Sequence, residues 1–376
     1  MPVTVKSFAK INLGLRIGPA REDGFHELRT VYQTIGLHDV IRVSMQRGTG
    51  IEIRCADPRV PRDESNTCFR IVERAMAALG TKGRVVIEIE KRLPVQGGLG
   101  GASANAVAAL LGLERAARKT LTPAEKLRIA ADVGSDLPLF LMGGAVLGVG
   151  RGEQVYPLPD FPATACVVVT PEIGVSTPKA FAEWDRLCGS CGAGTVAVEA
   201  ASGLLSSEEI VAEKLAELAS NRTGEGARPS TSRPHTSRGV ATAKLTGGSA
   251  SDRMNELGRG LSAWLSEPYS SAPSDFLARR GRAENPLLWL VRAGIENDFE
   301  QVVFPQYPTL GEAKGALVRA GARYASLSGS GSTLYGLFAS RQAAASAVKK
   351  LRRAGWAAQA AMTLTRAAYW RRMWAE

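Results

Sequence analysis

The stretch Leu93–Asn105, which reads LPVQGGLGGASAN, lies between a predicted strand (Arg84–Glu90) and a predicted alanine-rich helix (Gly101–Ala117). Four of the five residues in Gly97–Gly101 are glycines, so the backbone can turn tightly and aim its N–H groups at one anion. The helix that follows brings the positive end of its dipole to the same place, and Ser103 adds a hydroxyl. The stretch therefore predicts a phosphate-binding turn. It is not a P-loop, because no Lys-Ser or Lys-Thr pair follows the glycines.

Two charged side chains stand in apolar surroundings elsewhere in the chain. Lys10 interrupts the apolar segment Ala9–Leu15 (AKINLGL), and a buried ammonium needs an acidic residue or a phosphate as its partner. A lysine on an edge strand can instead extend its head group to water. Asp136 follows the predicted helix Thr122–Val133 and precedes an apolar run. A carboxylate in this position either caps the next segment or accepts a proton from a hydroxyl.

Two further stretches have the composition of ligand-contacting loops. An Asp-Gly turn leads into Phe25 and His26, which could stack on a planar ligand group and hydrogen-bond to it. A plain hairpin loop is the alternative for this stretch. The segment Ser328–Thr333 (SGSGST) joins two predicted strands, and its small residues allow a ligand close to the backbone, which favours contact with substrate or phosphate.

Composition limits the class of protein. The 376 residues carry a net charge of +11, which suits either nucleic acid or a multiply phosphorylated small substrate. No run of 18 apolar residues occurs, so a transmembrane helix is not expected. The N-terminal segment Met1–Lys10 lacks the apolar core of a signal peptide, and five scattered cysteines argue against a secreted disulfide framework. A cytoplasmic protein is the expectation.

Strand and helix patterns alternate along the chain in an α+β manner and predict two domains, residues 1–160 and 161–376. Strands are predicted early in the chain at Val3–Phe8, Asn12–Ile17, Asp39–Met45, Gly50–Arg54 and Arg84–Glu90. Residues from Cys188 to about Asp275 are rich in Gly, Ser, Thr, Ala and Arg and read as an insertion in the second domain. Its middle, Asn221–Arg238, has too few apolar side chains to offset the entropy of ordering and is predicted to be flexible.

Together these stretches resemble the GHMP kinase superfamily of small-molecule kinases. The resemblance is carried by Ala9–Leu15, Asp23–Leu28, Pro94–Asn105, Gly134–Pro138, Asn297–Glu300 and Ser328–Ser332. They occur in the family's order and span nearly the whole chain except the insertion. The pair AKINLGL and DGFHEL resembles one branch in particular, whose substrate is a cytidine diphosphate-linked methylerythritol.

The resemblance implies a catalytic pair and a nucleotide loop. Asp136 would draw the proton from the substrate hydroxyl, and Lys10 would orient Asp136 and stabilise charge on the transferring phosphoryl group. The ATP phosphates would be wrapped by Pro94, Gly97, Gly98, Leu99, Gly100, Gly101, Ala102 and Ser103. The loop departs from the family pattern at Gln96, Ala102, Ala104 and Asn105, which leaves open whether a side chain binds Mg²⁺. The implied cofactors are ATP as phosphoryl donor and Mg²⁺ held mainly by phosphates and water.

The resemblance also implies where the acceptor binds and how the chain folds. Phe25 and Phe181 would sandwich the cytosine ring, His26 would read its polar edge, and Asn12 would lie near the reacting hydroxyl. The implied fold is α+β with two lobes, the first like ribosomal protein S5 domain 2 and the second ferredoxin-like, with the site between them. No nucleic acid or membrane partner is expected, and either a monomer or a homodimer is compatible with the sequence.

Two alternatives stay open at this point. One is another GHMP kinase of the mevalonate or homoserine type, against which Phe25, His26 and Phe181 argue. The other is a basic RNA-binding protein on an S5-like fold, which the net charge allows.

Overall fold

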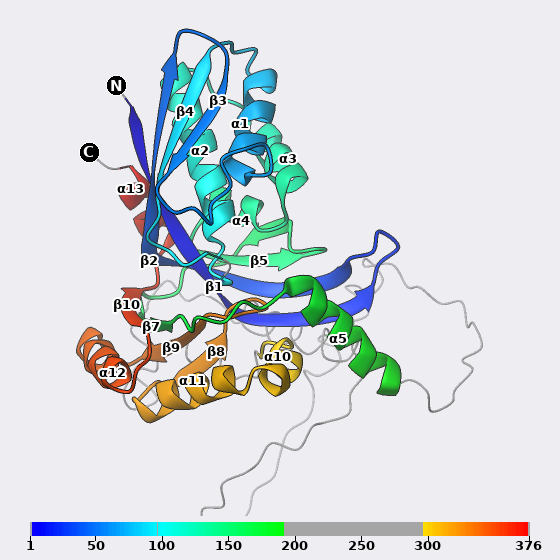
Figure 1. The fold of residues 1–376 in the computed structure, drawn as a ribbon, viewed down its shortest axis with the longest axis vertical. Helices are drawn as coiled ribbons and strands as arrows, with labels where there is room; N and C mark the ends of the chain where they lie inside the picture. The colour runs from blue at the N-terminus through cyan, green and yellow to red at the C-terminus, as the bar shows by residue number, and fades with distance from the viewer. Residues whose placement is uncertain (1, 96, 192–295, 375–376) are drawn as a thin grey trace, which may run out of the picture. The chain divides into compact units, whose positions relative to one another are not determined.

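The structure is a computed structural model that describes residues 2–95, 97–191 and 296–374. The chain divides into two compact units, residues 1–186 with 248–376, and residues 187–247. Apart from the end of one helix, the second unit lies outside the described residues, as does the predicted flexible segment Asn221–Arg238. The predicted domain boundary after residue 160 stays a prediction. The described part of the first unit contains two β-sheets with helices packed on each (Figure 1).

The first sheet has the strand order β3-β4-β2-β5-β6, and β1 pairs with β2. Its strands are β1 (Val3–Ala20), β2 (His26–Gln46), β3 (Gly50–Cys55), β4 (Arg84–Glu90), β5 (Ala145–Val149) and β6 (Gln154–Pro157). All its pairings are antiparallel except that between β3 and β4. The α+β character of the prediction is therefore confirmed for this part of the chain.

The long hairpin of β1 and β2 differs from the prediction. The two predicted strands Val3–Phe8 and Asn12–Ile17 are one strand of 18 residues, and β2 begins at His26 rather than Asp39. Irregularities in the β1–β2 register near Lys10 and Asn12 interrupt the alternation on which the prediction relied. A strand with such irregularities reads as two short segments in the sequence.

The helices of the first lobe cover one face of this sheet. They are α1 (Thr67–Ala78), α2 (Gly101–Ala117), α3 (Pro123–Val133) and α4 (Leu137–Met142). Asn66 caps α1 through Cys68 N, and Thr122 forms a capping box with Glu125 at the start of α3, both residue types that favour helix starts. The core between sheet and helices is made of aliphatic side chains such as Val43, Ile87 and Leu110.

The second sheet is antiparallel, with the order β10-β7-β9-β8. Its strands are β7 (Ala165–Val169), β8 (Tyr324–Leu327), β9 (Leu334–Phe338) and β10 (Ala358–Met362). The helices of this lobe are α5 (Thr177–Cys191), α10 (Glu300–Gln306), α11 (Pro308–Arg319) and α12 (Arg341–Arg353). Side chains of the β1–β2 hairpin, such as Ile11 and Val31, share a buried core with Val168 and Tyr335 of this sheet. The hairpin therefore joins the two lobes (Figure 1).

The basic and aromatic C-terminal segment forms a helix that the sequence analysis did not predict, α13 (Arg366–Met373). Tyr369 is buried in the core between the first sheet and its helices, and its hydroxyl donates to Phe140 O at 2.7 Å. The Trp370 indole donates to Met142 O at 3.1 Å. These aromatic side chains therefore attach the C-terminal helix to the first lobe. Across the described ranges, every helix is too short or too polar to cross a bilayer.

Candidate active site

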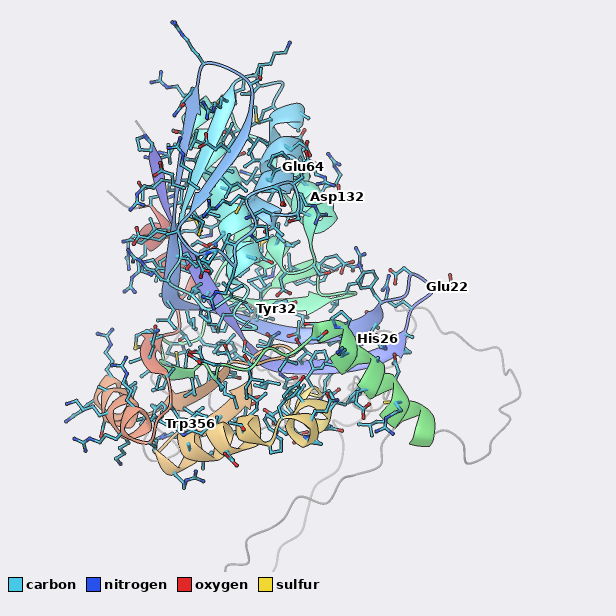
Figure 2. All side chains as sticks on the ribbon, in the orientation of Figure 1. Glu22, His26, Tyr32, Glu64, Asp132 and Trp356 are labelled. Carbon is cyan, nitrogen blue, oxygen red and sulfur yellow. The ribbon has the colours of Figure 1, made fainter. Side chains whose placement is uncertain are left out.

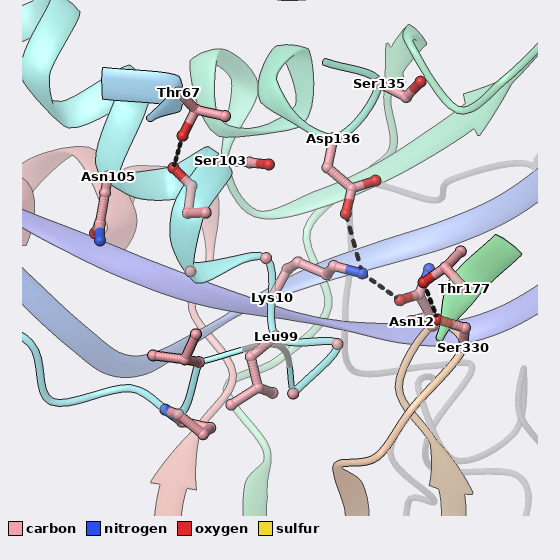
Figure 3. Close-up of a pocket in the computed structure, with 18 of the residues that line it drawn as sticks. Lys10, Asn12, Thr67, Leu99, Ser103, Asn105, Ser135, Asp136, Thr177 and Ser330 are labelled. Carbon is pink, nitrogen blue, oxygen red and sulfur yellow. Dashed lines mark hydrogen bonds and ion pairs between the residues drawn. The ribbon is translucent and has the colours of Figure 1, made fainter. Parts of the chain in front are cut away.

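A pocket of about 620 Å³ is lined by residues from all five stretches that the sequence analysis singled out. Lys10, Phe25, Gly98, Asp136 and Ser330 represent those stretches in its wall. They are far apart in the sequence, and the β1–β2 hairpin, the glycine loop and the start of α4 bring them together (Figure 3). Gln96 lies outside the described residues.

The glycine loop is held against the Ser328–Thr333 segment by direct hydrogen bonds. The Ser328 hydroxyl donates to Gly98 O at 2.9 Å, and Thr333 N donates to Gly97 O at 3.1 Å. Gly98 has φ +76°, and a Cβ there would lie 2.2 Å from Ser328 O. No side chain fits at this position, so glycine is required by both the conformation and the close approach. Gly329 and Ser330 of the same segment also line the pocket.

The loop ends at the N-terminus of α2, which faces the pocket. Gly100 is the N-cap in the left-handed conformation, and no side chain caps this helix end. Gly101, Ala102 and Ser103 of the first turn line the pocket. Uncapped N–H groups at the positive end of a helix attract anions, which agrees with the predicted phosphate loop.

The Lys10 side chain lies in the middle of the pocket wall. Its ammonium is 3.3 Å from Asp136 Oδ2 and donates to Asn12 Oδ1 at 2.6 Å (Figure 3). The Lys10 side chain is only 4% exposed, so it does not reach out to water as an edge-strand lysine would. Its backbone N donates to Leu99 O at 3.0 Å, which ties β1 to the glycine loop. The predicted pairing of Lys10 with a carboxylate is confirmed.

Asp136 stands at the N-cap position of α4 but makes no capping hydrogen bond. Its carboxylate turns into the pocket instead, where Oδ2 faces Lys10 and Oδ1 accepts from the Tyr32 hydroxyl at 3.1 Å. The side chain is 33% exposed, so a ligand can reach it. Of the two interpretations of Asp136, the geometry supports a group that faces the pocket rather than a cap.

Asn12 is fixed from both sides. Its Oδ1 accepts from Lys10, and its Nδ2 donates to Thr30 Oγ1 at 2.7 Å. The Thr30 hydroxyl donates in turn to Gly14 O at 2.8 Å. This chain of bonds holds the Lys10 ammonium in one place, because neither side chain of the pair can rotate without losing a buried hydrogen bond.

The end of the pocket beyond Lys10 is aromatic. The His26 ring stacks on Phe181 at 4.9 Å with an interplanar angle of 13°, and His26 Nε2 lies 2.6 Å from Asp185 Oδ1. Phe25 is 50% exposed, and the Arg151 guanidinium lies 5.0 Å from its ring centroid. Figure 2 shows His26 beside α5. The structure therefore brings Phe25, His26 and Phe181 to one end, as predicted, and adds a cation there.

A buried carboxylate that the sequence analysis did not single out supports the other end. Asp39 accepts from Lys91 Nζ at 2.6 Å, from the backbone N of Arg92 and Leu93 at 2.7 Å each, and from Asn105 Nδ2 at 2.9 Å. It thereby joins the strand before the glycine loop to the helix after it. The Lys91 ammonium would lie 3.2 Å from a Cβ at Gly101, so it sits directly against the loop.

Tyr32 and Arg151 also line the pocket, and the sequence analysis did not single them out. Tyr32 lies opposite Asn12 in the β1–β2 register, and only that register shows that it faces the pocket. Arg151 follows β5 in a glycine-rich turn whose direction no local pattern indicates. In the described ranges 2–95, 97–191 and 296–374, no three His, Cys, Asp or Glu side chains form a metal-binding group.

Comparison with known families gives two matches along the chain. The profile of the GHMP kinases N terminal domain matches residues 66–144, and that of the GHMP kinases C terminal domain matches residues 286–357.

The chain is similar to curated proteins named 4-diphosphocytidyl-2-C-methyl-D-erythritol kinase. The one from Solibacter usitatus (strain Ellin6076) is 34% identical over 347 residues, which cover 92% of this chain and 84% of the relative. The one from Synechococcus sp. (strain JA-2-3B'a(2-13)) is 32% identical over 351 residues, 93% of this chain and 89% of the relative. The one from Rhodococcus jostii (strain RHA1) is 40% identical over 187 residues, 50% of this chain and 60% of the relative.

Solved structures show the same fold. A crystal structure of 4-(cytidine 5'-diphospho)-2C-methyl-D-erythritol kinase matches with a TM-score of 0.61 at 25% identity, covering 96% of this chain and 98% of that one. The homoserine kinase from Cytophaga hutchinsonii matches with a TM-score of 0.60 at 18% identity, covering 97% of this chain and 95% of that one. The second likeness concerns the fold alone. The predicted two-lobed GHMP kinase fold is confirmed.

Proposed function

The chain belongs to the 4-diphosphocytidyl-2-C-methyl-D-erythritol kinase family of GHMP kinases, and from this premise we propose that it phosphorylates the compound in that name. ATP would be the phosphoryl donor and the 2-hydroxyl of the methylerythritol the acceptor, a step of non-mevalonate isoprenoid precursor synthesis. The observation that supports this most strongly is the Lys10 ammonium between Asp136 and Asn12, in the same pocket as the glycine loop.

The two ends of the pocket suit two different ligands. The uncapped N-terminus of α2 suits the phosphates of ATP, because it offers positive potential beside a glycine-rich loop. Val60 and Thr67 also line the pocket, which we propose takes the rest of the nucleotide. Proposed ATP contacts are Pro94, Gly97, Gly98, Leu99, Gly100, Gly101, Ala102 and Ser103.

The aromatic end suits a nucleobase. Phe25 offers an exposed ring face, and the Phe181 ring supports His26 by stacking on it. Asp185 holds Nε2 of His26, which leaves Nδ1 as the nitrogen for a nucleobase. Arg151 beside Phe25 adds a cation that suits the diphosphate of the acceptor. Lys10 and Asp136 lie between the two ends of the pocket, where the acceptor hydroxyl and the γ-phosphoryl group would meet.

The reaction then follows from the positions of the charged groups. Asp136 would accept the proton of the attacking hydroxyl as its oxygen bonds to the γ-phosphorus and the bond to the β-phosphate oxygen breaks. Lys10 would hold the Asp136 carboxylate in place and stabilise charge on the phosphoryl oxygens. Holding the two reactants in line supplies much of the acceleration, since phosphoryl transfer needs little covalent chemistry from the protein.

Oxygen atoms near the loop fit a magnesium ion that arrives with ATP. The Ser103 hydroxyl lines the pocket in the first turn of α2, and Mg²⁺ takes one or two protein oxygens together with phosphates and water. When bound, the ion neutralises charge on the phosphates. The oxygen ligand that the protein gives to Mg²⁺ is part of this proposal. We also propose that the protein acts in the cytoplasm.

An assay of ADP release tests the function. The protein receives ATP and Mg²⁺ with the cytidyl compound, mevalonate, homoserine or galactose in separate reactions. We expect turnover with the cytidyl compound; turnover only with mevalonate or homoserine would assign another GHMP activity. Salt-sensitive RNA binding with no ADP release from any acceptor would favour the RNA-binding alternative.

A pair of aspartate variants locates the activity in this pocket. Asp136→Asn is expected to lower kcat by at least about a hundredfold with little change in ATP binding. Asp132→Asn is the matched control, because Asp132 is half-exposed on α3 and pairs only with Arg128 among the interactions described for it. Equal turnover in the two variants would remove Asp136 from the mechanism.

A further inference from the structure

Tyr32 contacts the oxygen of the Asp136 carboxylate that does not face Lys10. Its hydroxyl donates to Asp136 Oδ1 at 3.1 Å, while the Lys10 ammonium lies 3.3 Å from Oδ2. The same ammonium lies 5.4 Å from the centroid of the Tyr32 ring. Each oxygen of the carboxylate therefore has its own donor, one phenol and one ammonium.

The fold builds a slot for this phenol. Tyr32 is 2% exposed and lies in the first third of β2, where Figure 2 labels it. A Cβ at Gly148 would lie 2.5 Å from Tyr32 Cε2, and a Cβ at Gly152 would lie 2.6 Å from the phenol oxygen. Two glycines thus leave the space that the ring and its hydroxyl occupy. A side chain at either position would push the hydroxyl from its place beside Asp136.

The phenol keeps its proton. Burial, together with the negative charges of Asp136 and Glu153, holds the pKa of Tyr32 well above its usual value. The charged groups that face it are Lys10 from β1, Asp136 at the start of α4 and Glu153 after β5. The Tyr32 hydroxyl is therefore protonated at neutral pH and can donate to Asp136.

We propose that Tyr32 is a positioning residue for the phosphoryl transfer: its hydroxyl fixes Oδ1 of Asp136 so that Oδ2, beside Lys10, faces the acceptor. This inference rests on the proposed function. In the step, the acceptor O–H bond breaks and its proton goes to Oδ2. The acceptor oxygen bonds to the γ-phosphorus, the bond to the β-phosphate oxygen breaks, and ADP leaves.

Without the hydroxyl, the carboxylate can rotate about its Cβ–Cγ bond. A Phe at this position keeps the ring in its slot and removes only the donor. Lys10 then remains as the partner of one carboxylate oxygen, and the other oxygen loses its donor. The carboxylate then spends less time in the orientation that presents one oxygen to both Lys10 and the acceptor, which lowers the rate of the chemical step and leaves substrate binding unchanged.

Kinetics of Tyr32→Phe test the proposal. We expect kcat to fall about ten- to hundredfold, the effect of losing one hydrogen bond to a charged group, with KM for both substrates within about twofold. Tyr369→Phe is the matched control, because it removes another buried phenol hydroxyl, one that donates to the backbone O of Phe140. In an Asp136→Ala background, adding Tyr32→Phe should change the residual rate by less than about twofold.

A measurement without substrate tests the contact itself. In protein labelled with ¹³C at tyrosine Cζ, the Tyr32 signal is assigned by its loss in Tyr32→Phe. It should shift in Asp136→Ala, while the Tyr369 signal stays in place. If wild type shows no turnover with the cytidyl compound, the proposed function fails, and the ¹³C shift still decides whether the contact exists.

Three results would overturn the inference. They are an unchanged kcat in Tyr32→Phe, an equal loss of kcat in Tyr369→Phe, and a Tyr32 signal that does not respond to Asp136→Ala.

Discussion

Replacing Gly98 by alanine tests whether the glycine loop must lie against the Ser328 segment. The new Cβ would lie 2.2 Å from Ser328 O, whereas real Cβ atoms stay at least 3.0 Å from such an atom. The loop would have to retreat by roughly 0.8 Å, and a displacement of about 1 Å can lower catalysis about a hundredfold. We therefore expect kcat/KM to fall by about a factor of 100.

Backbone strain alone must be separated from this displacement. Gly98 has φ +76°, so alanine there also costs about 1–3 kcal/mol of conformational strain. Gly321→Ala is the matched control, because Gly321 has φ +105° after α11 and open space around its Cβ position. It should lower the unfolding free energy by a similar amount and leave kcat/KM within about twofold.

Steady-state ADP release and chemical unfolding of both variants provide the two measurements. ATP affinity, followed by equilibrium binding, should fall in Gly98→Ala, since the loop is the proposed phosphate contact. A Gly98→Ala enzyme with kcat/KM within about threefold of wild type would refute the reasoning. So would an equal loss of activity in Gly321→Ala, because that loss would come from strain and not from the loop's position.

Three further predictions concern charge and burial. Lys10→Ala should lower kcat by about 10²–10³-fold in the ADP assay, since it removes the cation beside the proposed base. Asp39→Asn should lower the unfolding free energy in urea by about 3–5 kcal/mol, because it breaks a buried ion pair and turns a donor toward other donors. Burial raises the pKa of the Cys68 and Cys166 thiols to about 12, so at a pH of about 8 iodoacetamide should modify the exposed Cys188 in folded protein and spare those two, as peptide mass spectrometry would show. Rapid modification of Cys68 would contradict the buried environment of its thiol.

Local patterns predicted many of the elements well. The capping residues of α1 and α3 and the bounds of β4 and α2 follow from short-range chemistry that the sequence displays. The same patterns failed where long-range pairing overrides alternation. The β1–β2 hairpin is longer than predicted because register irregularities and two different cores on its faces remove the simple period of two.

The pocket residues also divide into those that local patterns predict and those that only long-range pairing reveals. Lys10, Asp136 and the glycine loop could be predicted because each carries a local anomaly: a charge among apolar residues, a carboxylate between helices, or four glycines together. Tyr32 shows no such anomaly. A tyrosine in a strand reads as an ordinary core residue, and its partner Asp136 is 104 residues away.

By itself, the sequence determined the chemistry available to this protein: a loop that must be glycine, a lysine that must have a partner, and aromatic residues near a histidine. The tertiary structure alone decided how these groups share one pocket. The β1–β2 register set Tyr32 opposite Asn12, and the start of α4 turned Asp136 toward Lys10. What a residue type can do locally depends on its own sterics and charge, which the sequence displays. The distances between remote side chains depend on strand register and packing, which no short segment contains.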